Sequence, residues 1–253
     1  MLINTVVLFL RDTLPIFLLI SVLLALPRVS SVNILWRLFA LIFIALLTYP
    51  KLGLVSEFYE GAGFELLKTL LFFVAWIGMC FLASYSTSNS SLLSIGVSLL
   101  VLGIGLPNSL HFLVYFISEL TRNSDSTLLL LGTTIGLGIS ISIAILLNIF
   151  LTHFVNLKVT QCFISVFVAA QAANIALLLE QTDTFPSPNQ LWDSSDIVSD
   201  NSEYGHLLNA LVGYEATPSI NYILVFLIAL IVPNLITFLC TRQRSTPLKE
   251  AAC

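Results

Sequence analysis

The stretch LINTVVLFLRDTLPIFLLISVLLAL, residues 2–26, decides the fold class. It is long enough to cross the hydrocarbon core of a bilayer, which takes about 20 apolar residues. Arg11 and Asp12 lie side by side inside it, where each ionised side chain costs roughly 2.5–3.5 kcal/mol on insertion scales. An ionisable residue at that depth indicates a functional site, so we expect Arg11 and Asp12 to face the protein interior.

The rest of the chain has the same apolar character. Of its 253 residues, 57% are hydrophobic and 9% are charged, and its mean hydropathy is +0.98. A soluble domain carries about 25% charged residues, so the composition predicts an all-α polytopic membrane protein. We expect seven transmembrane helices, at residues 2–26, 34–49, 65–86, 91–117, 127–151, 158–180 and 219–240.

One long acidic loop separates the sixth and seventh spans. Residues 181–218 hold Asp183, Asp193, Asp196, Asp200, Glu203 and Glu215 but no Lys or Arg, and we expect a short helix near residues 206–212. The C-terminal tail instead carries Arg242, Arg244 and Lys249. Basic residues favour the cytoplasmic side, so we expect an inner (plasma) membrane protein with a cytoplasmic C-terminus. Seven spans then place the N-terminus and the acidic loop outside.

Two proline-containing elements suggest an internal repeat. Arg11–Pro15 reads RDTLP in the first span, and Pro107–His111 reads PNSLH in the fourth. Three spans separate the two elements, so they run in opposite directions, as in the inverted repeats of many transporters. We therefore expect a 3+3 inverted repeat plus one helix. The two repeats are expected at residues 1–86 and 91–180. The acidic loop follows at residues 181–218, and the seventh helix and tail at residues 219–253.

Three stretches resemble one known family. They are Phe9–Pro15, the segment AAQAAN at residues 169–174 with Glu180 after it, and the block HLLNALVGY at residues 206–214, followed by ATPS at residues 216–219. With the span count and loop lengths, these resemble the oxidase-coupled, high-affinity iron permeases of fungi and bacteria. Those are seven-span proteins with an Arg-Glu-Gly-Leu-Glu element in spans one and four. The resemblance implies iron import through the paired carboxylates of the two elements.

The chain departs from that element at the carboxylate positions. Arg11 matches the family's Arg, Asp12 stands at the first Glu and Pro15 at the second. The PNSLH element of the fourth span has no Arg and neither Glu, so one of four carboxylates remains. A residual metal site is one interpretation, with Asp12, Asn108 and His111 as ligands that suit Fe(II). A structural ion pair between Arg11 and Asp12 is the other.

Asn108 and His111 are three residues apart and share a helical face. The resemblance implies that spans one and four touch, and Asp12 and His111 could then meet where the two repeats join. Gln171 and Asn174 share a face of the sixth span. With Arg11 and Glu180, they are expected along a translocation path or in an ion pair. Gln171 and Asn174 are alternatively expected to hydrogen-bond between helices.

We therefore expect a divergent iron permease-like protein that imports iron across the cytoplasmic membrane. The alternative is a non-transporting, permease-like subunit or scaffold of a larger membrane complex. Expected partners are membrane lipid, other membrane subunits, and a periplasmic oxidase, cytochrome or metal carrier at the acidic loop. The sequence contains no nucleophile–base set, phosphate-binding loop or dinucleotide motif. We expect no enzyme activity, no bound cofactor beyond transported iron, and no nucleic-acid partner.

Overall fold

A computed structural model describes residues 2–27, 29–84, 90–121, 126–186, 190–200 and 202–245. Within these ranges, seven helices are long and apolar enough to cross a membrane, and no β-strand is present. The expected all-α polytopic membrane fold is thereby confirmed. The seven helices are α1 (Leu2–Leu24), α2 (Ser31–Thr48), α4 (Gly63–Ser84), α5 (Ser90–Thr121), α6 (Ser126–His153), α7 (Leu157–Gln181) and α9 (Ile220–Ser245).

Shorter elements fill two connections. The short helix expected near residues 206–212 is present as α8 (Glu203–Val212). Between α2 and α4, the five-residue α3 (Leu52–Ser56) and two single 3-10 turns replace what the sequence presented as a plain loop. Most span ends fall within a few residues of their expected positions. The fourth span continues to Thr121 rather than stopping at residue 117, and expected span residues 85–86 lie outside the described ranges.

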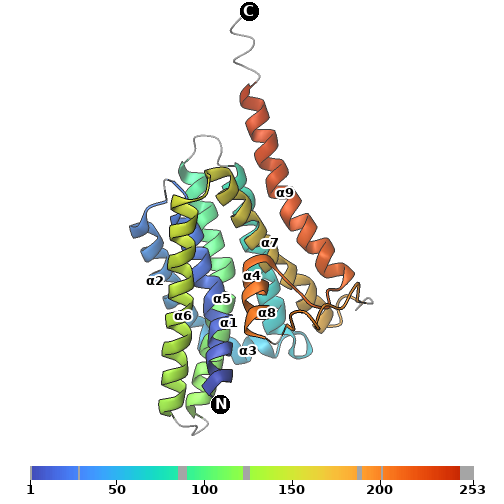
Figure 1. Ribbon diagram of the computed structural model, residues 1–253. Helices are drawn as coiled ribbons and strands as arrows, with labels where there is room; N and C mark the ends of the chain where they lie inside the picture. The colour runs from blue at the N-terminus through green and yellow to red at the C-terminus, as the bar shows by residue number, and fades with distance from the viewer. Residues whose placement is uncertain are drawn as a thin grey trace, which may run out of the picture.

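The helices form a bundle with α1 at its centre (Figure 1). α1 packs against α6 and α5, and α4 packs against α5 and α7. α2 covers α5 at one edge of the bundle, while α9 covers α7 at the other. The start of α1 and the end of α9 lie at opposite ends of the bundle, as seven crossings require.

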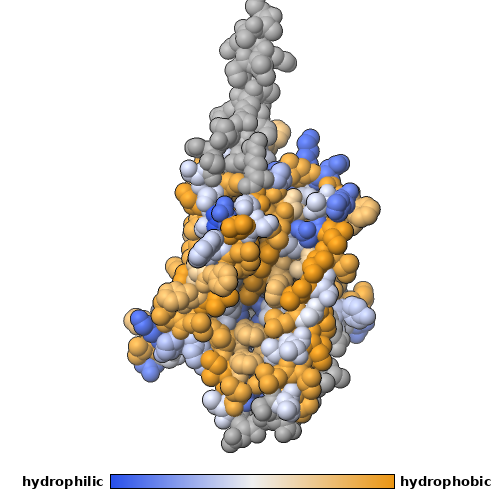
Figure 2. Space-filling model, turned by 90° about the vertical axis from the view of Figure 1, so that its left-hand side faces the viewer, coloured by the Kyte–Doolittle hydropathy of each residue, from blue (hydrophilic) through white to orange (hydrophobic). Residues whose placement is uncertain are grey.

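Small residues allow the closest helix contacts. On α6, a Cβ added at Gly136 would lie 3.2 Å from Cβ of Phe9 on α1, so these two helices meet almost backbone to backbone. On α7, the run Ala169–Ala173 is buried throughout, with Gln171 as its single polar member. Large apolar side chains instead face outward, and Figure 2 shows a broad hydrophobic surface of the kind that lipid covers.

The inverted repeat stays a prediction. If it is present, the first helix of each repeat should pack on the second helix of the other. Both α1 on α6 and α5 on α2 do so. However, α4 packs on α5 far more extensively than α7 packs on α1, so the packing is not symmetric throughout.

Candidate functional site

The central contact of the site joins Asp12 of α1 to His111 of α5. His111 Nδ1 lies 2.7 Å from Asp12 Oδ2, and Arg11 Nε lies 3.4 Å from Asp12 Oδ1. The Asp12 side chain is 5% exposed, whereas that of Arg11 is 46% exposed. Asp12 is therefore largely engaged by its two partners, and Arg11 keeps free surface for another group.

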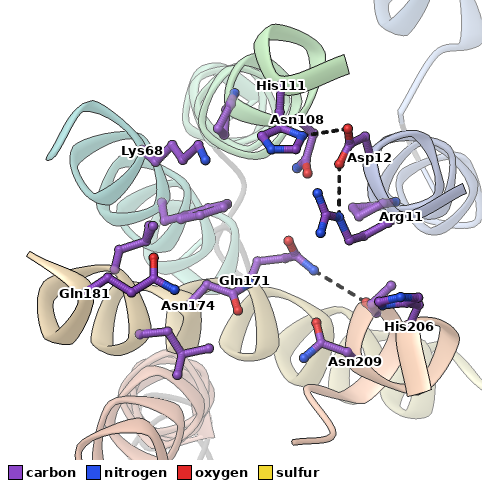
Figure 3. A pocket seen from close by; sticks show the side chains of 16 residues that line it. Arg11, Asp12, Lys68, Asn108, His111, Gln171, Asn174, Gln181, His206 and Asn209 are labelled. Atoms are coloured by element: carbon purple, nitrogen blue, oxygen red, sulfur yellow. Dashed lines mark hydrogen bonds and ion pairs between the residues drawn. The ribbon is translucent and has the colours of Figure 1, made fainter. Parts of the chain in front are cut away.

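These residues line a pocket of about 400 Å³ between the helices (Figure 3). Polar and charged side chains reach it from α1, α4, α5, α7 and α8, and apolar side chains complete its wall. The lining residues are Arg11, Asp12, Pro15, Lys68, Phe72, Pro107, Asn108, His111, Gln171, Asn174, Leu177, Leu178, Gln181, His206, Asn209 and Ala210.

Two prolines line the pocket beside the charged groups. Pro15 lies inside α1 and Pro107 inside α5, and neither helix is interrupted there. Because proline has no amide hydrogen, each removes one helical hydrogen bond to the carbonyl four residues earlier, at Arg11 and at Gly103. The backbone of both helices is thus less completely hydrogen-bonded next to the pocket than elsewhere.

Two cationic side chains face the pocket from different helices. In Figure 3, the Arg11 guanidinium and the Lys68 ammonium point toward the same space. The Lys68 ammonium also lies 4.3 Å from the centre of the Phe64 ring, a cation–π contact. Among the described residues, no carboxylate lies within ion-pair distance of Lys68. The Lys68 side chain therefore lies at the pocket and beside the Phe64 ring of its own helix.

Amide side chains supply most of the remaining polar lining. Asn108 Nδ2 donates to the carbonyl of Ile104 at 2.7 Å, in its own helix. Gln171 Nε2 is 3.5 Å from the carbonyl oxygen of Ala210 in α8. Asn174 lies on the same wall as Gln171. These groups offer both donors and acceptors to a polar solute.

The short helix α8 lies between α1 and α7 and brings His206 and Asn209 to the pocket. It starts where Ser202 Oγ accepts a hydrogen bond from the amide of Gly205, at 3.0 Å. It ends at Gly213, whose φ of 73° is the left-handed conformation that favours glycine. Asn209 Nδ2 then donates to the carbonyl of Tyr214 at 2.9 Å, which secures the segment that follows α8.

Two acids lie close together behind α8. Asp200 Oδ1 accepts from the amide of Ala216 at 2.8 Å, and Asn209 Nδ2 lies 3.4 Å from Glu215 Oε2. Burial, and then the negative charge of Asp200, raise the pKa of Glu215 to about 7. The carboxyl group beside α8 thus changes its charge near neutral pH.

Glu180 does not line the pocket. Its Oε1 accepts from Ser219 Oγ at 2.8 Å and from Asn221 Nδ2 at 2.9 Å. Ser219 Oγ in turn accepts from the amide of Tyr222 at 3.1 Å, inside the first turn of α9. Glu180 therefore ties the end of α7 to the start of α9. The sequence analysis left a translocation path or an ion pair open for Glu180; in the structure it accepts hydrogen bonds from Ser219 and Asn221.

The other expected site residues do come together. Arg11, Asp12, Asn108, His111, Gln171 and Asn174 all line the pocket. Sequence reasoning missed four further polar lining residues, Lys68, Gln181, His206 and Asn209. One signal could have found Lys68: it precedes Phe72 by four residues, and side chains with that spacing share a helix face.

The expected metal ligands fit a metal ion only in part. Asp12 and His111 are in contact, and Figure 3 draws Asn108 beside them. Within the described ranges, however, no three His, Cys, Asp or Glu side chains gather closely enough to hold a metal ion. The groups nearest to the Asp12 carboxylate also include Arg11, whose charge opposes a cation.

The pocket therefore combines a buried carboxylate in contact with a partly exposed imidazole, two cations, several amides and an apolar wall, between the candidate spans α1, α4, α5 and α7 and the short helix α8. Comparison with known proteins adds no relative: no family model, no curated protein and no solved structure matches this chain.

Proposed function

We propose that this protein is a permease-like membrane transport protein whose solute path includes the pocket between α1, α4, α5 and α7. The observation that carries the proposal is the contact of Asp12 with His111, 2.7 Å apart in two membrane-spanning helices. Ionisable groups inside spans are costly, and they mark solute and proton paths in transporters. The two prolines beside them are typical of the interrupted helices that surround transporter binding sites.

We place the protein in the inner (plasma) membrane, with the acidic loop outside and the C-terminus in the cytoplasm.

Iron import is the specific activity that the resemblance implies, and it is the first cargo to test. It is supported by Arg11 and Asp12 at the start of the family's motif and by the imidazole of His111 beside Asp12. The test is radio-iron uptake, with Fe(II) and Fe(III) supplied separately, in cells that lack their own high-affinity importer. Asp12→Asn and His111→Gln are the test variants.

Two matched controls accompany these variants. Asp196→Asn removes an exposed acid of the loop, and His153→Gln removes an exposed histidine at the end of α6. We expect uptake above the empty vector that both controls keep and both pocket variants lose. Good membrane expression without uptake in either redox state would overturn iron import.

A second candidate function is a non-transporting subunit of a larger membrane complex. The observation that favours it is the lack, among the described residues, of a three-ligand metal cluster where the resembling family has paired carboxylates. Stoichiometric co-purification of another membrane polypeptide, together with inactivity in uptake assays, would select this candidate.

A further inference from the structure

The charges that face the pocket do not balance. Arg11 and Lys68 contribute two positive charges, and Asp12 is the one acid among the lining residues. The histidines His111 and His206 add positive charge or none. With Lys68 protonated, the lining is thus net positive in every protonation state of the histidines. A net positive pocket in a low-dielectric setting attracts an anion and repels a bare metal cation.

Asp12 cannot satisfy both cations. It is held by His111 at 2.7 Å and touches Arg11 through Nε at 3.4 Å. No hydrogen-bond acceptor for the Lys68 ammonium is found among the described residues. The two cations point toward the same space from α1 and α4 (Figure 3). A carboxylate placed there would accept hydrogen bonds from both, and charge-assisted hydrogen bonds are the stronger kind.

The remaining wall distinguishes an organic anion from an inorganic one. Phe72 of α4 and the adjacent Leu177 and Leu178 of α7 give the pocket an apolar side. A volume of about 400 Å³ lies at the small end of the range for ligand pockets. A short hydrocarbon body would pack there, as in other sites that combine an apolar lining with a few polar groups.

From this arrangement, we infer that the pocket binds a small carboxylate-bearing organic anion, with the carboxylate between Arg11 and Lys68 and the carbon chain against Phe72 and the α7 leucines. The inference rests on the proposed function, because it names the solute class of the same path. The inferred solute is an anion, whereas the resemblance implies an iron cation. Its charge is inferred from the lining residues and not from the motif.

The experiment measures ligand-dependent thermal stability of the full-length purified protein in lipid nanodiscs. A ligand that binds the folded state raises the apparent melting temperature with its concentration. The probes are sodium butyrate, its neutral isostere butyramide, butylammonium chloride and MnCl2, each at matched ionic strength. We expect stabilisation by butyrate, and none by butyramide, butylammonium or Mn(II).

The variants locate the carboxylate. Arg11→Gln and Lys68→Gln are each expected to weaken the butyrate response at least tenfold, while Lys68→Arg, which keeps the charge, retains part of it. The matched controls are Arg37→Gln and Lys158→Gln. Arg37 lies outside the pocket, where its guanidinium donates to Ser98 Oγ at 2.9 Å, and Lys158 is exposed at the start of α7. Both controls should respond like the wild type.

Several results would overturn the inference: an equal response to butyramide, stabilisation by Mn(II) but not by butyrate, no response to butyrate, or an equal loss in Arg37→Gln. The melting temperature of each variant without ligand shows whether it folds. If butyrate binds but labelled butyrate is not taken up into proteoliposomes, the transport function is contradicted and the ligand class stands. If iron is taken up but butyrate gives no response, the ligand class is contradicted and the transport function stands.

Discussion

Asp12 and His111 are 99 residues apart in sequence, yet His111 Nδ1 and Asp12 Oδ2 lie 2.7 Å apart where α1 meets α5. The contact joins an imidazole to the only acid among the described residues that line the pocket, and Arg11 completes the group. Removal of His111 or Arg11 leaves the buried Asp12 carboxylate with fewer groups that offset its charge. The free energy of unfolding should therefore depend on this contact.

The first prediction concerns the coupling of this pair. His111→Ala should lower the free energy of unfolding by about 1–3 kcal/mol, because it leaves a buried charged group without its hydrogen bond. Asp12→Asn together with His111→Ala should cost less than the sum of the single changes, with a coupling of about 0.5–3 kcal/mol. Thermal and denaturant unfolding in detergent would measure the cycle. His153→Ala is the control, and additive effects would contradict the prediction.

The second prediction compares two glycines. Gly213 has a φ of 73°, and a Cβ there would lie 2.9 Å from Cβ of Ala170. Gly213→Ala should therefore destabilise by roughly 1–2 kcal/mol from the left-handed backbone alone, with a further loss from the contact. Gly138 on α6 has no atom within 4 Å of an added Cβ. Gly138→Ala should stabilise the helix by about 0.5–1 kcal/mol.

Melting temperatures of the two alanine variants, measured side by side, check this prediction. Equal shifts for Gly213→Ala and Gly138→Ala would mean that the end of α8 does not constrain the fold. A response to butyrate that is lost in Gly213→Ala but kept in Gly138→Ala would in addition connect α8 to the pocket.

The third prediction follows from the pKa of Glu215, which burial and Asp200 raise from 4.5 to about 7. The folded state binds this proton more tightly than the unfolded state does, so the group's contribution to stability is largest below pH 4.5. That contribution is lost as the pH rises to about 7. Glu215→Gln should therefore raise the melting temperature at pH 8 and flatten its decline between pH 5 and pH 8.

The matched control for Glu215→Gln is Asp196→Asn, an exposed acid of the same loop. Melting curves at pH 5, 6, 7 and 8 provide the comparison. An unchanged pH slope in Glu215→Gln would show that this carboxyl group does not carry the dependence.

Much of the architecture was predictable because apolar length alone identifies membrane spans. The seven helices and the short helix after the sixth span followed from hydropathy and turn residues. The approach of Asp12 to His111 was expected from the family resemblance, which implies that spans one and four touch. Hydropathy and turn residues are local features of the sequence. The high cost of ionised groups in lipid also predicts that a charged side chain in a span faces the protein interior.

The rest of the site depends on long-range packing that sequence patterns do not encode. Lys68 lies near the start of its span, where a long side chain reaches either the membrane surface or the interior. In the structure the Lys68 side chain lines the pocket, and its ammonium lies beside the Phe64 ring of its own helix. For Glu180, sequence patterns leave a translocation path and an ion pair open, because its hydrogen-bond partners Ser219 and Asn221 lie 39 and 41 residues further along the chain.

The order of synthesis gives the neighbouring positions of Arg11 and Asp12 a further consequence. Ribosomes add about 5–20 residues per second, so the 99 residues between Asp12 and His111 take roughly 5–20 s to make. During this interval His111 has not yet been made. Arg11, the residue that precedes Asp12 and lies 3.4 Å from it in the finished protein, is then the one of the two partners of Asp12 that is already part of the chain.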